Sequence, residues 1–209
     1  MEKTLAQIRS YLRDVASFAL PKYKELPGVD LYMEQVLAYV NGVLSSIEEE
    51  KTKALTSFMV NNYVKAGLVD KPTKKRYSRD QIGYLIAISL MKATVSMGDM
   101  KTFIAMDAGI SKNKEKLYRF FSDVESDILA STSAKVSKRV DELASRYASS
   151  GKSEKDKEMA RDALGLLAVR LSIQAAASKL LSDYIIHRLG ESMDEERQST
   201  KIKISEERQ

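Results

Sequence analysis

Two adjacent asparagines are the side chains of this sequence best placed to recognise another molecule. Asn61 and Asn62 fall within a short predicted helix, on the face that also carries Phe58 and Lys65, while Val60 lies on the opposite face. An asparagine amide can form two hydrogen bonds with an adenine edge in the major groove. We therefore expect one face of this helix to pack and the other to make contacts.

Positive charge is concentrated in and just after this helix. From Lys51 to Arg79 the chain has eight basic residues and one acid, a local balance of +7, so the remaining residues sum to −2 in a chain of net charge +5. Lysine and arginine bind backbone phosphates and position a protein on nucleic acid without reading its sequence. The predicted contacts to double-stranded DNA are Ser57, Phe58, Asn61, Asn62, Lys65, Lys74, Lys75, Arg76 and Arg79.

Each of these assignments has a plainer alternative. The asparagines also suit an ordinary polar helix surface, and the cations suit a solvated basic rim. An exposed Phe58 fits a thymine methyl group or a protein interface equally well. Tyr77 is expected to pack the basic loop onto the body, and Tyr63 to be half-buried with its hydroxyl near a phosphate.

The elements around these residues follow the order of a winged helix-turn-helix. Thr56 can cap the short helix, Leu55 and Val60 can form a hydrophobic staple, and Gly67 ends the helix. The segment Lys71–Tyr77 suits a two-stranded basic wing. Ser78–Gln81 then has the pattern of a capping box that starts another helix.

Apolar periodicity predicts helices on both sides of this module. One runs from Leu5 to Ala19 and is broken by Pro21 and Leu26–Gly28; the next is capped by Asp30. Ser96 is expected to cap a short helix after the wing. The acidic run Glu48–Glu50 separates the second helix from the basic segment.

Two long helices are predicted to pair as a C-terminal antiparallel hairpin. Ser111 begins the first, which runs to Tyr147, and the second spans about Asp156 to Leu189. The second helix has apolar residues on more than one face, which favours a homodimer. The predicted domains are therefore 1–110, a winged helix-turn-helix with its N-terminal helix; 111–190, the hairpin and dimerisation region; and 191–209, a frayed charged tail.

Composition limits the other functional classes. The chain has no cysteine, which excludes disulfides and thiol nucleophiles, and three prolines and nine glycines, which favours helix. Charged residues interrupt the N-terminus and the most apolar region, so we expect neither a signal peptide nor a membrane span. The single histidine, His187, and the lack of phosphate-loop and nucleophile motifs argue against catalysis, a metal or another cofactor.

The run NNYVKAGLV, followed by KKRYSRDQIGYL, resembles the DNA-reading half of MerR-type regulators. The matched positions are Tyr63, Lys65, Gly67, Leu68, Tyr77 and Ser78, and Val95–Met100 resembles the helix start after the wing of that family. The wider segment Ala19–Ile104, including LPGVDLYMEQVLAYV, is similar to the bacterial family catalogued as domain of unknown function 1836. This resemblance implies a DNA-binding fold without an assigned activity.

The sequence also departs from the MerR pattern. Asn61 and Asn62 stand where those regulators usually have an arginine and a first tyrosine. Their dimerising helix and sensor cysteines are not recognisable, so neither an inducer nor a metal carries over, and a small-molecule effector stays unknown.

The sequence thus predicts a mainly α protein in which a MerR-like winged helix-turn-helix precedes a C-terminal antiparallel helical hairpin. We expect a cytoplasmic, non-enzymatic transcriptional regulator that binds duplex DNA as a homodimer. The alternative is a module of the same fold that grips an acidic protein through Phe58, Met59 and the wing. Attachment to a membrane surface through the basic segment is a third reading, favoured only by charge.

Overall fold

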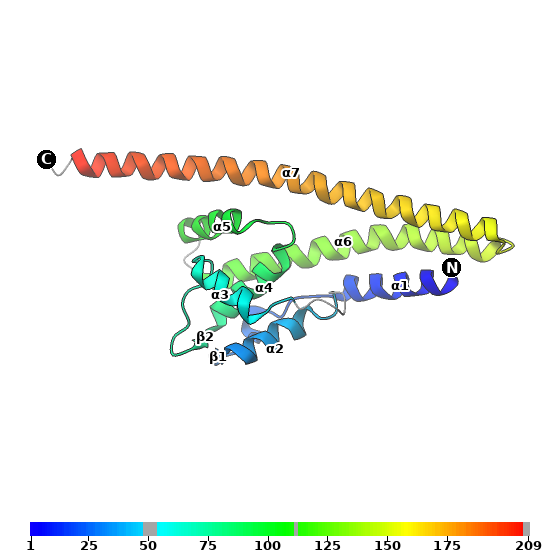
Figure 1. Cartoon of the computed structure of the whole chain (residues 1–209), viewed down its shortest axis with the longest axis horizontal. Helices are drawn as coiled ribbons and strands as arrows, with labels where there is room; N and C mark the ends of the chain where they lie inside the picture. The colour runs from blue at the N-terminus through cyan, green and yellow to red at the C-terminus, as the bar shows by residue number, and fades with distance from the viewer. Residues whose placement is uncertain (48–53, 111–112, 207–209) are drawn as a thin grey trace.

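The computed structural model describes residues 1–47, 54–110 and 113–206 and confirms that the chain is mainly α-helical (Figure 1). The described residues form seven α-helices, one 3-10 helix and two short strands. Their bounds are α1 Glu2–Ser17, η1 Tyr23–Glu25, β1 Leu31–Tyr32, α2 Met33–Leu44, α3 Ser57–Lys65, β2 Arg76–Tyr77, α4 Arg79–Met91, α5 Met97–Ile110, α6 Lys114–Ser149 and α7 Glu154–Glu206.

The main core lies between α2, α3 and α4. Val40 of α2, Val60 of α3 and Leu85 of α4 are each fully buried in it. Burying an aliphatic side chain of this size contributes about 1.5–3 kcal/mol. Tyr118 of α6 belongs to the same core, and its hydroxyl donates to the Pro21 carbonyl at 3.0 Å. The main core therefore includes a residue beyond position 110. The domain boundary predicted at that position stays a prediction.

A second core joins the N-terminus to the two long helices. Leu5 and Leu12 of α1 pack with Val140 and Tyr147 of α6 and with Ala160 of α7. Arg9 of α1 also pairs with a carboxylate of α6, Asp141, at 2.6 Å. The N-terminal helix thus packs mainly along α6 (Figure 1).

The small sheet differs from the wing that the sequence predicts. β2 pairs antiparallel with β1, which precedes α2, so Leu31 lies opposite Tyr77 and Tyr32 opposite Arg76. Within the basic loop, the described pairing is a single bridge between Thr73 and Arg76. The second strand therefore comes from a segment more than forty residues earlier, which local patterning could not indicate.

The helix starts follow the predictions in part. Ser96 accepts a hydrogen bond from the amide of Asp99 at 3.1 Å and caps α5, as predicted. Asp30 does not cap α2, because Leu31–Tyr32 forms a strand first and Tyr32 becomes the capping position. The predicted cap Ser111 and the acidic run Glu48–Glu50 lie outside the described residues, and Asn113 caps α6.

The last helix is much longer than predicted. α7 continues to Glu206, so the expectation of a frayed tail from residue 191 is wrong. The sequence after Gly190 has no proline or glycine and is rich in Glu, Arg and Lys, all good helix formers. One ion pair of spacing i,i+3 there joins Arg188 to Glu191 at 2.9 Å.

α6 and α7 run in opposite directions, and α7 forms one long edge of the molecule (Figure 1). Near their connecting turn they pack through Val140, Ala160 and Leu164. Beyond Leu171 most α7 side chains are exposed until Ile186, which is buried beside α5.

By length and composition, α7 could cross a membrane, in contrast to the expectation from its charged residues. The helical segment Glu154–Glu196 contains a window of mean hydropathy 1.4, none of which is buried within the molecule.

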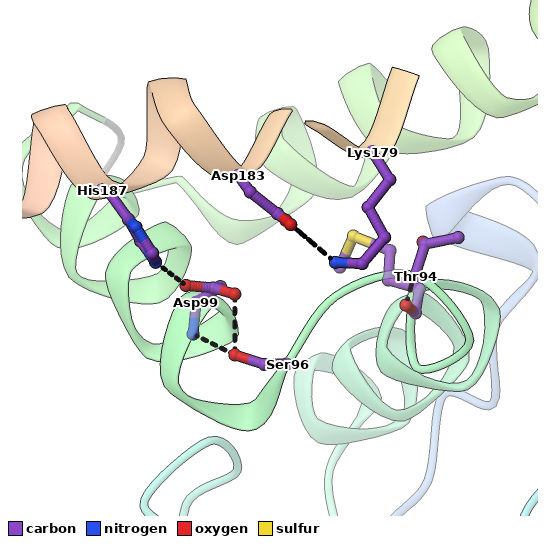
Figure 2. A network of polar contacts seen from close by, with 7 residues as sticks. Thr94, Ser96, Asp99, Lys179, Asp183 and His187 are labelled. Carbon is purple, nitrogen blue, oxygen red and sulfur yellow. Dashed lines mark hydrogen bonds and ion pairs between the residues drawn. The ribbon is translucent and has the colours of Figure 1, made fainter. Parts of the chain in front are cut away.

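A polar contact attaches the distal part of α7 to α5. In Figure 2, Lys179, Asp183 and His187 project from one side of α7 towards the start of α5. The His187 Nε2 atom lies 3.6 Å from Asp99 Oδ1, and Ser96 Oγ donates to the other Asp99 oxygen at 2.7 Å. This contact defines the side of α7 that faces the body.

Glu125 of α6 is a half-buried acid that has no ion-pair partner among the described residues. Both of its carboxylate oxygens are buried without a hydrogen-bond partner there, and this burial raises the pKa of Glu125 to about 7. The unfolded chain should titrate near the ordinary value of 4.5. The folded state therefore binds the extra proton between these two pH values, and stability falls as pH rises through that window.

We expect Glu125→Gln to be nearly neutral at pH 4.5 and to stabilise the protein by about 1–2 kcal/mol at pH 8.5, since the amide removes the buried charge. Urea unfolding at both pH values measures the difference. Asp127→Asn, which alters an exposed carboxylate on the same helix, is the control. An effect of Glu125→Gln that does not change with pH would contradict the assignment.

Candidate nucleic-acid interface

The helix α3 is held at both ends by its own sequence. The Thr56 hydroxyl accepts from the amide of Met59 at 3.3 Å, as predicted, and Leu55 and Val60 are both fully buried. At the other end, Gly67 adopts φ 74°, a left-handed conformation that favours glycine. The amide of Leu68 then donates to the Tyr63 carbonyl at 2.9 Å, which closes the helix.

The two faces of α3 are divided nearly as predicted. Ser57, Phe58, Asn61 and Lys65 are exposed, and 73% of the Phe58 surface is accessible. Asn62 is half-buried, so it lies at the edge of the exposed face and not at its centre.

Tyr63 is more deeply buried than predicted. It is 5% exposed, and burial raises its pKa. Tyr63 therefore belongs to the main core, and the contact between its hydroxyl and a phosphate stays a prediction.

A half-buried asparagine fixes the start of α3 to α2. The side chain of Asn41 donates to the Leu55 carbonyl and accepts from the Leu55 amide, both at 2.9 Å. Its Nδ2 atom also donates to the Leu37 carbonyl at 2.7 Å. We call the two bonds to Leu55 the Asn41 clamp. Asn41 is not among the residues predicted from the sequence, although a polar side chain within the apolar stripe of α2 is a visible signal.

The tip of the basic loop is a tight turn with two lysines in its central positions. Thr73 and Arg76 exchange backbone hydrogen bonds of 3.1 and 2.9 Å, and Lys74 and Lys75 between them have φ of 51° and 64°. A two-residue loop with both central φ values positive is a type I′ turn. The turn exposes both lysine side chains.

The two predicted arginines are held against tyrosines. The Arg76 guanidinium lies 4.7 Å from the centre of the Tyr32 ring, and its Nη2 atom donates to the Tyr32 hydroxyl at 2.9 Å. Arg79 lies over Tyr23 at 5.4 Å and donates to the Pro27 carbonyl at 3.4 Å. Arg76 remains exposed, whereas Arg79 is half-buried.

The turn after α3, the basic loop and the start of α4 share one polar hollow of about 320 Å³. Gly67, Thr73 and Arg76 contribute to its wall. Gln81 connects these parts, because its Nε2 atom donates to the Asp70 carbonyl at 2.8 Å while its Oε1 atom accepts from the Ser78 amide at 2.7 Å. The capping box is thus confirmed, and α3 and the sheet lie at the same end of the molecule (Figure 1).

A second, apolar cavity of about 600 Å³ lies between α4, α5 and α6. Its polar wall groups bond to each other: Tyr23 donates to Asp80 at 2.5 Å, and Lys114 donates to the Tyr84 hydroxyl at 2.7 Å. Among the described residues, no group of three or more histidine, aspartate or glutamate side chains could hold a metal ion.

These features define a mainly helical domain in which a short capped helix lies beside a basic turn. Residues 21–122 match the sequence model of the family described as Domain of unknown function (DUF1836). The match covers the segment from η1 to the first part of α6 and supports the resemblance to this family. No curated protein and no solved structure gives a significant match to the chain.

Removing the Asn41 clamp should destabilise the domain. We expect Asn41→Ala to lower the free energy of unfolding by about 2–4 kcal/mol, because it leaves the buried polar groups of Leu55 unpaired. Urea unfolding measures this loss. The matched control is Asn61→Ala, whose effect should stay within about 0.5 kcal/mol because Asn61 is exposed. Equal effects of the two substitutions would contradict the assignment.

Proposed function

We propose that residues 21–122 form a MerR-like winged helix-turn-helix that binds double-stranded DNA, and that the protein is a non-enzymatic transcriptional regulator. The observation that carries this proposal is the presence, at one end of the molecule, of an exposed helix face with Asn61 and of a rigid turn that displays Lys74 and Lys75. In this proposal the C-terminal hairpin supports a homodimer, and the protein acts in the cytoplasm.

The arrangement suits DNA binding in which some side chains contact base edges and others contact phosphates. Asn61 is on a helix fixed by a cap, a glycine stop and the Asn41 clamp, so its amide can be presented to base edges with little conformational freedom. The exposed cations Lys65, Lys74, Lys75 and Arg76 suit phosphates. If each takes one phosphate, log K should fall with log salt concentration at a slope of about −3.6 per copy.

The turn offers a test that leaves the fold intact. Lys74→Asn with Lys75→Gly removes two cations and introduces the residue pair most favoured in type I′ turns. We expect weaker binding to all duplexes and a salt slope smaller by about 1.8, with unchanged or higher thermal stability. Fluorescence anisotropy across a salt series measures both quantities.

The control for charge alone is Lys135→Gln with Lys138→Gln, which removes two exposed cations from α6. This variant should keep the wild-type affinity and slope. If the two variants behave alike, only net charge matters and the proposed wing contact is wrong.

Asn61 should carry sequence preference. We expect Asn61→Ala to reduce the discrimination between the selected duplex and a mismatched one by about 1–3 kcal/mol, with a smaller effect on binding to unrelated DNA. Duplexes selected from a random pool, titrated against both proteins, provide the measurement. A uniform loss of affinity across all duplexes would indicate that Asn61 contacts the DNA backbone instead of the bases.

The exposure of Phe58 favours a second candidate function, the recognition of an acidic protein by the same face. The two functions separate in a pull-down with and without nuclease. A partner that stays bound after nuclease digestion, and that Phe58→Ser releases, supports the second function.

A further inference from the structure

An apolar stripe extends along α7 with no partner among the described residues. Counting about 100° per residue, its members fall within one narrow sector of the helix. The stripe consists of Leu166, Val169, Ile173, Ala177, Leu180 and Tyr184. All six are exposed, the five larger ones by 54 to 72%. It spans 19 residues, or about 27 Å of helix from the first to the last.

The stripe lies next to the side of α7 that faces the body. At one end of α7, Leu164 and Leu167 pack into the second core, and at the other end Ile186 is buried beside α5. The polar side chains Lys179 and Asp183 project towards the body between these points (Figure 2). Between these points the side chains of the stripe remain exposed.

We propose that the stripe pairs with the same stripe of a second copy, in antiparallel orientation. The six residues lie 9, 6 and 2 positions before Ala175 and 2, 5 and 9 positions after it. A two-fold axis at Ala175 therefore brings Leu166 level with Tyr184 of the partner subunit, and Ile173 level with Ala177 of the partner subunit. Such near-palindromic spacing makes the surface self-complementary, as a two-fold interface requires.

The charges at the ends of the stripe favour the antiparallel arrangement. The same axis places Asp162 level with Arg188 of the partner subunit, and Lys155 level with Glu195 of the partner subunit. These four side chains are exposed in the single chain. A parallel pair in register would instead place each charge beside its own copy, which is repulsive. The charge pattern thus selects one of the two orientations.

A lipid bilayer suits this helix less well than a second copy. Arg170, Gln174 and Lys179 fall within the apolar stretch. Each arginine or lysine near the bilayer centre costs about 2.5–3.5 kcal/mol. In the antiparallel pair Arg170 and Gln174 flank the stripe and Lys179 lies on the side facing the body, so the buried face is the apolar one.

Cysteine cross-linking can test the orientation, because the natural chain has no cysteine. Leu166→Cys and Tyr184→Cys are prepared separately, mixed to allow exchange, and treated with a short bismaleimide. We expect a cross-linked dimer in the mixture and almost none in either variant alone, since like positions lie about 27 Å apart along the axis. Cross-linking of each variant alone would show a parallel pair and overturn the proposal.

Sedimentation equilibrium without DNA tests the surface itself. Ile173→Lys should weaken the dimer at least about 100-fold, while the circular dichroism signal stays unchanged because Ile173 is 63% exposed. Ala175→Lys, an exposed position on the other side of α7, is the matched control and should leave the dimer intact. A wild-type protein that is monomeric at tens of micromolar, or that floats with phosphatidylcholine vesicles, would overturn the proposal. None of these measurements depends on DNA binding.

Discussion

The Asn41 clamp is the constraint on which the proposed interface depends. α3 has nine residues, too few for a stable helix in isolation, so its position must come from its contacts. Val60 and Tyr63 supply apolar contacts to the main core. Apolar packing alone, however, tolerates small shifts of the helix along its axis. The paired hydrogen bonds from Asn41 to the Leu55 backbone fix the point where the chain enters the helix. The orientation of the exposed residues follows from that point.

Local signals in the sequence predicted local structure well. Thr56, Gly67 and the Ser78–Gln81 pair were recognisable because each acts on backbone groups within a few residues. The strand partner of Arg76–Tyr77 was not, since pairing with Leu31–Tyr32 is a long-range choice.

The candidate site shows the same division. The exposed face of α3 followed from helical periodicity, whereas the stacking of Arg76 on Tyr32 and of Arg79 on Tyr23 depended on the tertiary arrangement. Arg79 in particular was predicted to bind phosphate because its charge is visible in the sequence and its burial is not. The extent of α7 was underestimated because charged residues were equated with disorder, although glutamate, lysine and arginine are good helix formers.

The length of α7 also affects how the molecule moves in water. Its 53 residues correspond to about 80 Å of continuous helix. α5 packs beside the distal part of this rod, and α1 lies near its beginning (Figure 1). Such an elongated body has more translational friction than a sphere of equal mass, so it elutes early from a sizing column. It also tumbles anisotropically, and amide bonds parallel to the rod should relax differently in NMR from those that cross it.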